Sequence, residues 1–392
     1  MKETQRVPLY TQIREYIYDQ ISRGNWQASD RLPSEKELSE QFNVSRITVK
    51  NALAELTKQG LIYRIQGKGS FVADGSKGEP SLYKSQVSLQ SNNCIAFLIP
   101  RLENTFTAKL VRNVEQECAA AGMKMILALT HDSQETEKKL IREMIQLGVS
   151  GIIIFPVDGE GYNEEIVKLS MNNYPLVLID RYFRGIETNS VCSDNSAGAY
   201  NAVNHLLSLG HRKIGVVSTF SSWTTSIEDR IEGYEKALAE AKIPINRLYR
   251  CDHFNPEQMN LVLRTGEANL DAKRDIQQFL KSNQEMTAIF ATNIAVGLTV
   301  IAAAREIGRN VPDDLSVVYY DFEPLPLLFM RPTCVIQDEE SLVKQAVELL
   351  FAVVREPQRK RERILIPSSL TIGDSTAPLS NAEKRKTYTE TH

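Results

Sequence analysis

Short apolar segments alternate with amphipathic helical segments over most of this 392-residue chain, from Cys94 onward. The segments of strand length are CIAFLIP (94–100), MKMILAL (123–129), GIIIFPV (151–157), PLVLID (175–180), KIGVVS (213–218), TAIFAT (287–292), LSVVYYD (315–321) and CVIQ (334–337). Strands that are apolar throughout are buried on both faces, and helices between them imply parallel, doubly wound sheets. Because there are too many strands for one small sheet, we expect two lobes that separate near residues 188–194.

The segment before these strands has a different organisation. Residues 74–92 lose the periodicity and gather Gly, Pro, Ser and Lys, which is typical of a linker. The expected domains are 1–74, a linker at 75–92, and a two-lobed α/β domain at 93–374. Lobe one is expected at about 93–190 and 338–360, and lobe two at about 191–337 and 361–374. Residues 363–373, RILIPSSLTIG, are expected to form a last strand that completes the fold, and the polar tail 375–392 is expected to be disordered.

The N-terminal domain reads as three helices and a hairpin. Apolar residues at helical spacing predict a first helix over Leu9–Ile21, and Ser34 with Glu37 three residues later forms a capping-box pattern for the second. Ser45 is the expected cap of a third helix that stops at Gly60. Two β-prone runs, LIYRI and SFVA, flank the loop QGKG and predict a hairpin. This order is that of a winged helix-turn-helix.

Such a unit fits the major groove of DNA with the N-terminus of its second motif helix leading. Arg46 suits a guanine edge, and Thr48 and Lys50 suit a base edge or a phosphate. The Gly-containing loop can approach a neighbouring minor groove. A small helical bundle with a solvated basic face is the alternative, because residues 1–76 hold only eleven Lys or Arg against nine Asp or Glu. The case for DNA therefore depends on where the basic residues lie.

Residues 5–74 resemble the winged helix of the GntR repressor family, through PLYTQIREYIYDQISRGNW, LPSEKELSEQFNVSRITVKNALAELTKQGLI and QGKGSFV. The resemblance implies a DNA-binding surface formed by Glu35, Lys36, Ser45, Arg46, Ile47, Thr48, Lys50, Gln66, Gly67 and Lys68. Members often carry arginine at the positions of Lys36 and Lys50. Since lysine is a point charge and not a bidentate fork, these two lysines are expected to hold phosphates.

Residues 93–374 resemble the effector domain of the LacI/GalR repressors and the related periplasmic sugar-binding proteins. The resemblance rests on VLIDRYF, VCSDNSAGAYNAVNHLLSLGHRKIGVV, DRIEGYEKAL, TAIFATN, VPDDLSVVYYDF and VIQDEESLVKQAVELL. The combination with a GntR-type domain is similar to that of arabinose-repressor-type regulators. The implied fold class is an α+β winged helix-turn-helix followed by a two-lobed α/β periplasmic-binding-protein-like domain with two parallel doubly wound sheets.

A sugar site needs planar polar groups for the hydroxyls and aromatic rings for the ring faces. The resemblance implies a ligand site formed by Asn104, Phe106, Asp180, Arg181, Trp223, Arg230, Asn293, Asp321 and Gln337, with Phe254 as a weaker stacking candidate. Each polar group follows a strand or begins a helix, where open parallel sheets bind ligands. An ion pair between lobes for Asp180 and Arg181, a helix cap for Asp321, and a surface aromatic for Trp223 are the structural alternatives.

Two residues depart from the LacI/GalR pattern. Ile294 stands where an aspartate is usual, and Tyr319 stands where a glycine is usual. Loss of the aspartate removes a charge that orients neighbours or caps a helix, and the larger Tyr319 is expected either to narrow the cleft or to repack the strand end. His211 follows Gly210 and is expected to be a turn residue, not a ligand.

The predicted function is that of a cytoplasmic transcriptional repressor whose affinity for operator DNA is set by a small carbohydrate. A homodimer is expected on a pseudo-palindromic site. The alternatives are a nucleoside, purine or sugar-phosphate effector, and an activator. An enzyme and a transporter's binding protein are disfavoured, because we find no nucleotide-binding loop, nucleophile elbow or metal-ligand spacing and no signal peptide. No cofactor, metal or membrane contact is expected.

Overall fold

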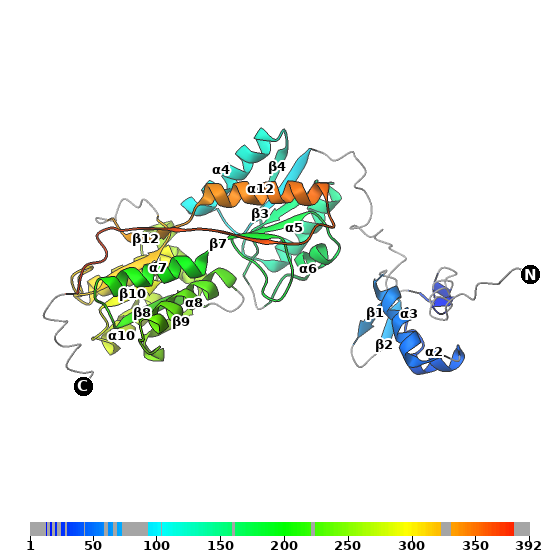
Figure 1. The fold of residues 1–392 in the computed structure, drawn as a ribbon, viewed down its shortest axis with the longest axis horizontal. Helices are drawn as coiled ribbons and strands as arrows, with labels where there is room; N and C mark the ends of the chain where they lie inside the picture. The colour runs from blue at the N-terminus through cyan, green and yellow to red at the C-terminus, as the bar shows by residue number, and fades with distance from the viewer. Residues whose placement is uncertain are drawn as a thin grey trace, which may run out of the picture. The chain divides into compact units, whose positions relative to one another are not determined.

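The computed structural model describes residues 30–42, 44–58, 62–65, 69–72, 93–102, 104–158, 161–220, 224–322 and 331–379, with isolated positions between 13 and 27. The chain separates into two compact units, 1–88 and 89–392. Each unit is described by itself (Figure 1).

The first unit is a helix-turn-helix with a hairpin. It contains α2 (Glu35–Gln41), α3 (Arg46–Lys58), and the antiparallel strands β1 (Ile62–Ile65) and β2 (Gly69–Val72). Ser34 and Glu37 make the reciprocal hydrogen bonds of the predicted capping box. Most of the helix expected over Leu9–Ile21 lies outside the described residues. Its described positions are helical, and Ile13 and Ile17 pack into the buried core of the unit.

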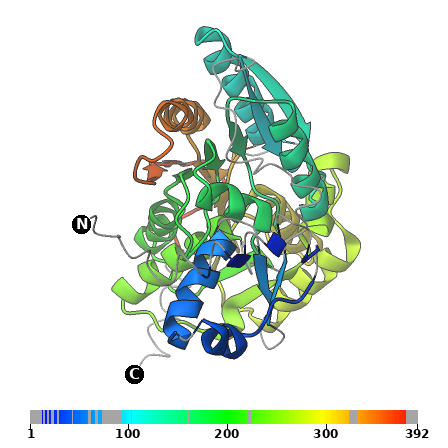
Figure 2. The same cartoon turned by 90° about the vertical axis from the view of Figure 1, so that its right-hand side faces the viewer.

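The second unit has two six-stranded sheets, each flanked by helices. The first sheet has the order β13-β7-β6-β5-β3-β4 and is parallel throughout. Its strands are β3 (Cys94–Ile99), β4 (Lys124–Leu129), β5 (Ile152–Ile154), β6 (Leu176–Ile179), β7 (Ser190–Ser193) and β13 (Arg363–Ile366). Its helices are α4 (Thr105–Ala120), α5 (Gln134–Gln146), α6 (Glu164–Met171) and α12 (Glu339–Arg355), and α12, orange in Figures 1 and 2, packs beside α4.

The second sheet has the order β14-β12-β11-β10-β8-β9, with only β14 antiparallel to its neighbour among the described strands. Its strands are β8 (Ile214–Thr219), β9 (Arg250–Phe254), β10 (Ala288–Ala291), β11 (Ser316–Tyr320), β12 (Thr333–Ile336) and β14 (Ser369–Thr371). Its helices are α7 (Asn195–Ser208), α8 (Thr225–Glu240), α9 (Pro256–Thr265), α10 (Leu270–Ser282) and α11 (Ile294–Glu306), and a short 3₁₀ turn covers Arg247–Tyr249. The first two helices bury one face, and the other three bury the opposite face.

The chain crosses between the sheets three times, at Asp194, at 337–338 and at 367–368. The expected partition between the lobes therefore needs two corrections. Residues 361–374 were assigned to lobe two, but β13 extends the first sheet and only β14 joins the second (Figure 1). The apparent single strand RILIPSSLTIG is interrupted at Pro367, which lies between the two strands and carries the chain across. Residues 191–193 likewise belong to the first sheet.

The start of the expected disordered tail is also corrected. Ser375 is buried, donates from its hydroxyl to the Val317 carbonyl oxygen and accepts from the Thr333 backbone N–H. Leu379 is buried and its N–H donates to the Leu209 carbonyl oxygen. Polar composition predicts disorder here, but these residues form hydrogen bonds with backbone and hydroxyl groups at the starts of β11 and β12, which are buried. Residues 380–392 lie outside the described residues.

No helix in the described part of the chain is long and apolar enough to cross a membrane. The same residues contain no cluster of His, Cys, Asp and Glu side chains arranged to hold a metal ion.

Candidate functional site

The exposed N-terminus of α3 carries the expected DNA-reading residues. Ser45 precedes the helix, and its hydroxyl oxygen accepts from the Thr48 backbone N–H at 3.2 Å and lies 2.9 Å from the Thr48 hydroxyl oxygen. These two side chains fix the start of the helix. Arg46 is the first helical residue and Lys50 lies one turn further, and both side chains are exposed. An exposed guanidinium at a helix start is available to a nucleic acid.

The remaining expected DNA contacts belong to α2, to α3 and to the tip of the hairpin. Glu35 is half-buried, whereas Lys36 is exposed and lies 3.9 Å from Glu40, a surface pair that contributes little to stability. Ile47 is part of α3, but its side chain lies outside the described residues. The hairpin of β1 and β2 is confirmed, whereas its tip, Gln66, Gly67 and Lys68, lies outside the described residues.

Arg230 is a buried cation on α8 of the second lobe. Only 4% of its surface is exposed. Its Nε donates to Asn195 Oδ1 at 2.8 Å, its Nη1 donates to the Thr292 carbonyl oxygen at 2.7 Å, and its guanidinium lies 3.7 Å from the centre of the Tyr320 ring. Tyr320 is held in turn by its hydroxyl, which donates to the Asn195 carbonyl oxygen. The charge of this fixed guanidinium influences the pKa of one carboxyl group from each lobe.

The first of these carboxyl groups is Asp180, which follows β6 in the first lobe with a φ of 69°. Burial raises the pKa of Asp180 to about 6, and the nearby positive charges of Arg181 and Arg230 counter part of that rise. Arg181 Nη1 contacts Asp158 Oδ1 at 2.7 Å, whereas its Nε lies 3.7 Å from Asp180 Oδ2. The nearer anion of Arg181 is therefore Asp158, which sequence reasoning missed.

The second carboxyl group is Asp321, which follows β11 in the second lobe with a φ of 68°. Burial raises its pKa, whereas Arg230 and a hydrogen bond from Gln337 lower it. Gln337 Nε2 donates to Asp321 Oδ1 at 2.9 Å, and Gln337 Oε1 accepts from the Ser193 hydroxyl at 2.6 Å. Asp321 caps neither of the described helices nearest to it in sequence, since Asn293 caps α11 and Asp338 caps α12. Residues 323–330, which follow it, lie outside the described residues, so the cap alternative stays a prediction. The structure thus brings Asp180, Arg230, Asp321 and Gln337 together.

Other expected ligand residues have structural roles. Asn104 Oδ1 accepts from the Thr107 N–H and caps α4, and Asn293 Oδ1 accepts from the Val296 N–H and caps α11. Phe106 is partly buried and packs edge-on against Phe155 at 6.4 Å. Phe254 is buried in the core of the second lobe, so its assignment as a stacking ring is wrong. Trp223 lies outside the described residues.

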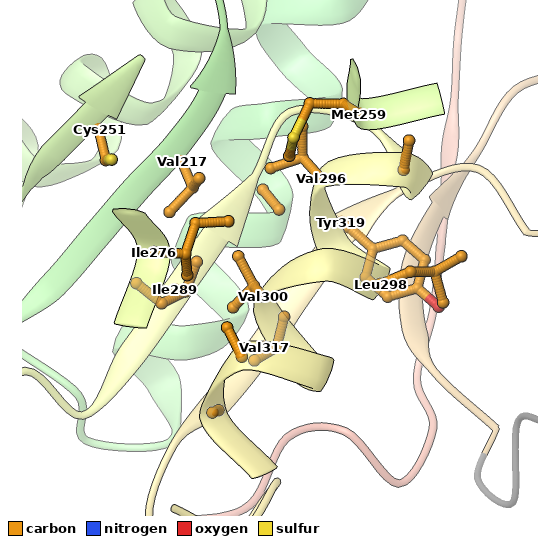
Figure 3. Packing of buried hydrophobic residues seen from close by; sticks show 14 of the residues in the cluster. Val217, Cys251, Met259, Ile276, Ile289, Val296, Leu298, Val300, Val317 and Tyr319 are labelled. Atoms are coloured by element: carbon orange, nitrogen blue, oxygen red, sulfur yellow. The ribbon is translucent and has the colours of Figure 1, made fainter. Parts of the chain in front are cut away.

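The unusual Tyr319 repacks the strand end and does not face the other site groups. It is fully buried in the second-lobe core, where Figure 3 shows its ring beside Leu298. An added Cβ at Gly297 would lie only 2.4 Å from Tyr319 Cδ1, so the glycine leaves room for the ring. Ile294 is buried in the same cluster. The two departures are thus packed into the hydrophobic core between α11 and β11.

His211 is also structural. It is buried, and its two ring nitrogens lie 2.9 Å from the Thr287 hydroxyl oxygen and 3.0 Å from the Ala377 carbonyl oxygen. It therefore links the second sheet to residues beyond β14, in agreement with the expectation that it is not a ligand.

Comparisons with known proteins match both units. The family described as bacterial regulatory proteins, gntR family, matches residues 9–72. The family described as a periplasmic binding protein-like domain matches residues 203–376. The chain joins a GntR-type DNA-binding domain to a periplasmic-binding-protein-like effector domain. It is therefore a DNA-binding transcriptional regulator.

Similar proteins extend over nearly the whole chain. An arabinose metabolism transcriptional repressor of Geobacillus stearothermophilus is 28% identical over 360 residues, covering 91% of this chain and 93% of that protein. The transcriptional repressor PurR of Photobacterium profundum is 26% identical over 355 residues, covering 88% of this chain and 99% of that protein.

Solved structures share the fold of this GntR-type regulator. A cellobiose complex of the regulator CelR has a TM-score of 0.65 at 17% identity, covering 88% of this chain and all of that one. A LacI family regulator from Enterococcus faecium with bound ribose has a TM-score of 0.59 at 24% identity, covering 73% of this chain and all of that one.

Proposed function

We propose that this regulator represses carbohydrate-utilisation genes and leaves its operator when a monosaccharide, such as a pentose or deoxyhexose, binds between its lobes. The observation that carries the proposal is the meeting of Asp180 from the first lobe with Arg230 and Asp321 from the second. Burial raises the pKa of both carboxyl groups, and the nearby charge of Arg230 counters part of that rise, while Gln337 Nε2 donates to Asp321 Oδ1 at 2.9 Å. Sugar hydroxyls both donate and accept, so alternating carboxylates and guanidinium donors suit them.

A phosphorylated effector is the second candidate, because Arg181 and Arg230 would also suit a phosphate. The charges of the site weigh against it. Asp158, Asp180 and Asp321 carry three negative charges when ionised, against two positive charges on the arginines, and one of those arginines already contacts Asp158 at 2.7 Å. A dianion would therefore enter a site whose carboxylates repel it. The similarity to PurR keeps nucleosides and purines as further alternatives.

DNA binding would be carried by the exposed Arg46 and Lys50 of two GntR-type domains, on a homodimer that grips a pseudo-palindromic operator in the cytoplasm. The monosaccharide lowers operator affinity only if it prefers the lobe arrangement that is less compatible with DNA. Coupling between two such sites is typically about 1–3 kcal/mol, a change of about 5- to 150-fold in affinity.

The test begins by selecting operator duplexes from a random pool with the full-length protein. Fluorescence anisotropy then measures operator affinity with and without pentoses, deoxyhexoses, their phosphate esters, nucleosides and purines, and calorimetry measures direct binding. We expect a neutral monosaccharide to bind and to weaken the DNA complex. If a phosphate ester or purine acts in its place, the effector assignment is wrong. If no compound of any class changes the DNA complex, the regulatory proposal itself fails.

A further inference from the structure

Asp158 joins the two lobes of the effector domain through one carboxylate oxygen. Its Oδ1 accepts from Arg181 Nη1 at 2.7 Å and from the Thr224 hydroxyl at 2.8 Å. Asp158 and Arg181 follow strands of the first sheet, whereas Thr224 immediately precedes α8 in the second lobe. The single oxygen therefore connects the arginine beside Asp180 to the opposite lobe.

The Thr224 hydroxyl is diverted from its usual local role. Threonine in this position normally caps the helix by accepting from a backbone N–H of the first turn, which stabilises a helix by about 1 kcal/mol. Thr224 makes no such cap hydrogen bond to α8. Its hydroxyl donates to Asp158 instead. The start of α8 therefore lacks the cap hydrogen bond, and the Thr224 hydroxyl forms a hydrogen bond with the other lobe.

The backbone next to Asp158 is fixed by a hydrogen bond to the buried carboxyl group of Glu137. Glu137 on α5 is fully buried, and its carboxyl oxygens accept from the Val157 N–H at 2.9 Å and from Asn163 Nδ2 at 2.6 Å. Arg181 Nη1 also donates to the Pro156 carbonyl oxygen at 2.8 Å. Residues 156–158 are therefore fixed on both sides, and the Asp158 carboxylate is preorganised.

A second contact between the lobes lies directly beside this one. The Tyr182 N–H donates to the Thr225 hydroxyl oxygen at 3.2 Å, and that hydroxyl donates to the Tyr182 carbonyl oxygen at 3.0 Å. Asp180 precedes Arg181 and Tyr182 in the chain, so these contacts draw the turn that carries the proposed ligand groups toward α8. Both depend on adjacent threonines at the start of the same helix.

We propose that Asp158 is a positioning residue for effector binding, which orients Arg181 and, through Thr224, favours the closed arrangement of the lobes. This inference rests on the proposed function, because it concerns the same effector site. An effector that binds only the closed arrangement has an apparent Kd equal to its intrinsic Kd divided by the fraction of closed molecules. Removal of the contact lowers that fraction and therefore raises the apparent Kd.

Thr224→Val removes the hydroxyl while the shape of the side chain and the Asp158–Arg181 pair are kept. We expect the Kd for the effector sugar to rise about three- to tenfold, the loss of one hydrogen bond, and Thr224→Ser to restore it to within about twofold. Thr265→Val is the matched control, since Thr265 donates to the Leu261 carbonyl oxygen at the far end of α9. Calorimetry on the full-length protein measures all three variants. An unchanged Kd for Thr224→Val, or an equal rise for Thr265→Val, would overturn the proposal.

A second arm needs no effector. In the ligand-free protein, the lowering of the thermal midpoint by Asp158→Ala and Thr224→Val together is expected to be smaller than the sum of the two single effects, because each variant removes the same contact. Additive effects would show that the two side chains do not interact, and would overturn the inference. Failure of every sugar to bind would instead refute the proposed function and leave this arm interpretable.

Discussion

Replacement of Tyr319 by glycine tests whether this unusual residue belongs to the core or to the effector site. Tyr319 is fully buried, and its hydroxyl has no hydrogen-bond partner among the described residues. Truncation of a buried aromatic ring costs about 3–5 kcal/mol, and relief of an unpaired hydroxyl offsets about 1–3 kcal/mol of that loss. We therefore expect Tyr319→Gly to lower the free energy of unfolding by about 2 kcal/mol, with effector affinity unchanged within about threefold.

Urea denaturation measures the first quantity and calorimetry the second, on the same protein preparation. Tyr319→Phe is the matched control, because it removes only the unpaired hydroxyl and should stabilise the protein by about 1 kcal/mol. Gly297→Ala should be destabilising alone, since its Cβ would lie 2.4 Å from the Tyr319 ring, but much less so in the Tyr319→Gly background. A large change in effector affinity with unaltered stability would refute this reasoning and place the ring beside the ligand.

Three further predictions concern the two functional surfaces. Arg46→Ala should reduce operator affinity at least tenfold in anisotropy titrations, because an exposed guanidinium at the start of α3 is lost. Effector binding, measured by calorimetry, should be unchanged. Retained tight operator binding would exclude Arg46 from the interface. Asp321→Ala should keep the protein on its operator in the presence of the sugar, because the carboxylate beside Gln337 that would accept a sugar hydroxyl is removed. Normal release in the same anisotropy titration would exclude Asp321 from the site. Because burial raises the pKa of Asp180 to about 6 and a sugar hydroxyl donates to its ionised form, effector affinity should fall as the pH drops below about 6. A flat calorimetric profile between pH 5 and 7.5, or an Asp180→Asn variant with the same pH dependence, would contradict that assignment.

Apolar runs predicted most of the sheets, because strands buried on both faces leave a clear sequence pattern. All eight strands of the alternating pattern are present, and the expected last strand, RILIPSSLTIG, is divided into β13 and β14. The two that were missed had weaker patterns. β7 is SVCS, which is buried through small, partly polar residues, and β9 is RCDHF at a sheet edge, where only two of its residues are buried. Edge and short strands are stabilised by their neighbours, so composition alone does not identify them.

The candidate site was predictable where a residue follows a strand, and less so where contacts depend on the other lobe. Asp180 and Asp321 lie at such positions, and the charge of Arg230 on α8 counters part of the rise that burial causes in both of their pKa values. Asn104 and Asn293 occupy similar positions, yet their side-chain oxygens cap helices. Asp158 was missed, although it follows the apolar run GIIIFPV, because its partners come from a distant turn and from the opposite lobe. Such pairings are set by tertiary structure.

The side chain of Gln337 links Asp321 of the proposed effector site to a crossover between the lobes. It lies on a crossover between the lobes, accepts from Ser193 of the first sheet and donates to Asp321 of the second lobe. Hydrogen bonds to a charged group contribute about 1.5–3 kcal/mol, which is comparable to the typical coupling of about 1–3 kcal/mol between linked sites. A ligand hydroxyl that donates to the Asp321 carboxylate beside Gln337 would join this network, and its contribution would depend on the relative position of the lobes. The hydrogen bonds from Ser193 to Gln337 and from Gln337 to Asp321 therefore connect the proposed effector site to the crossover between the lobes.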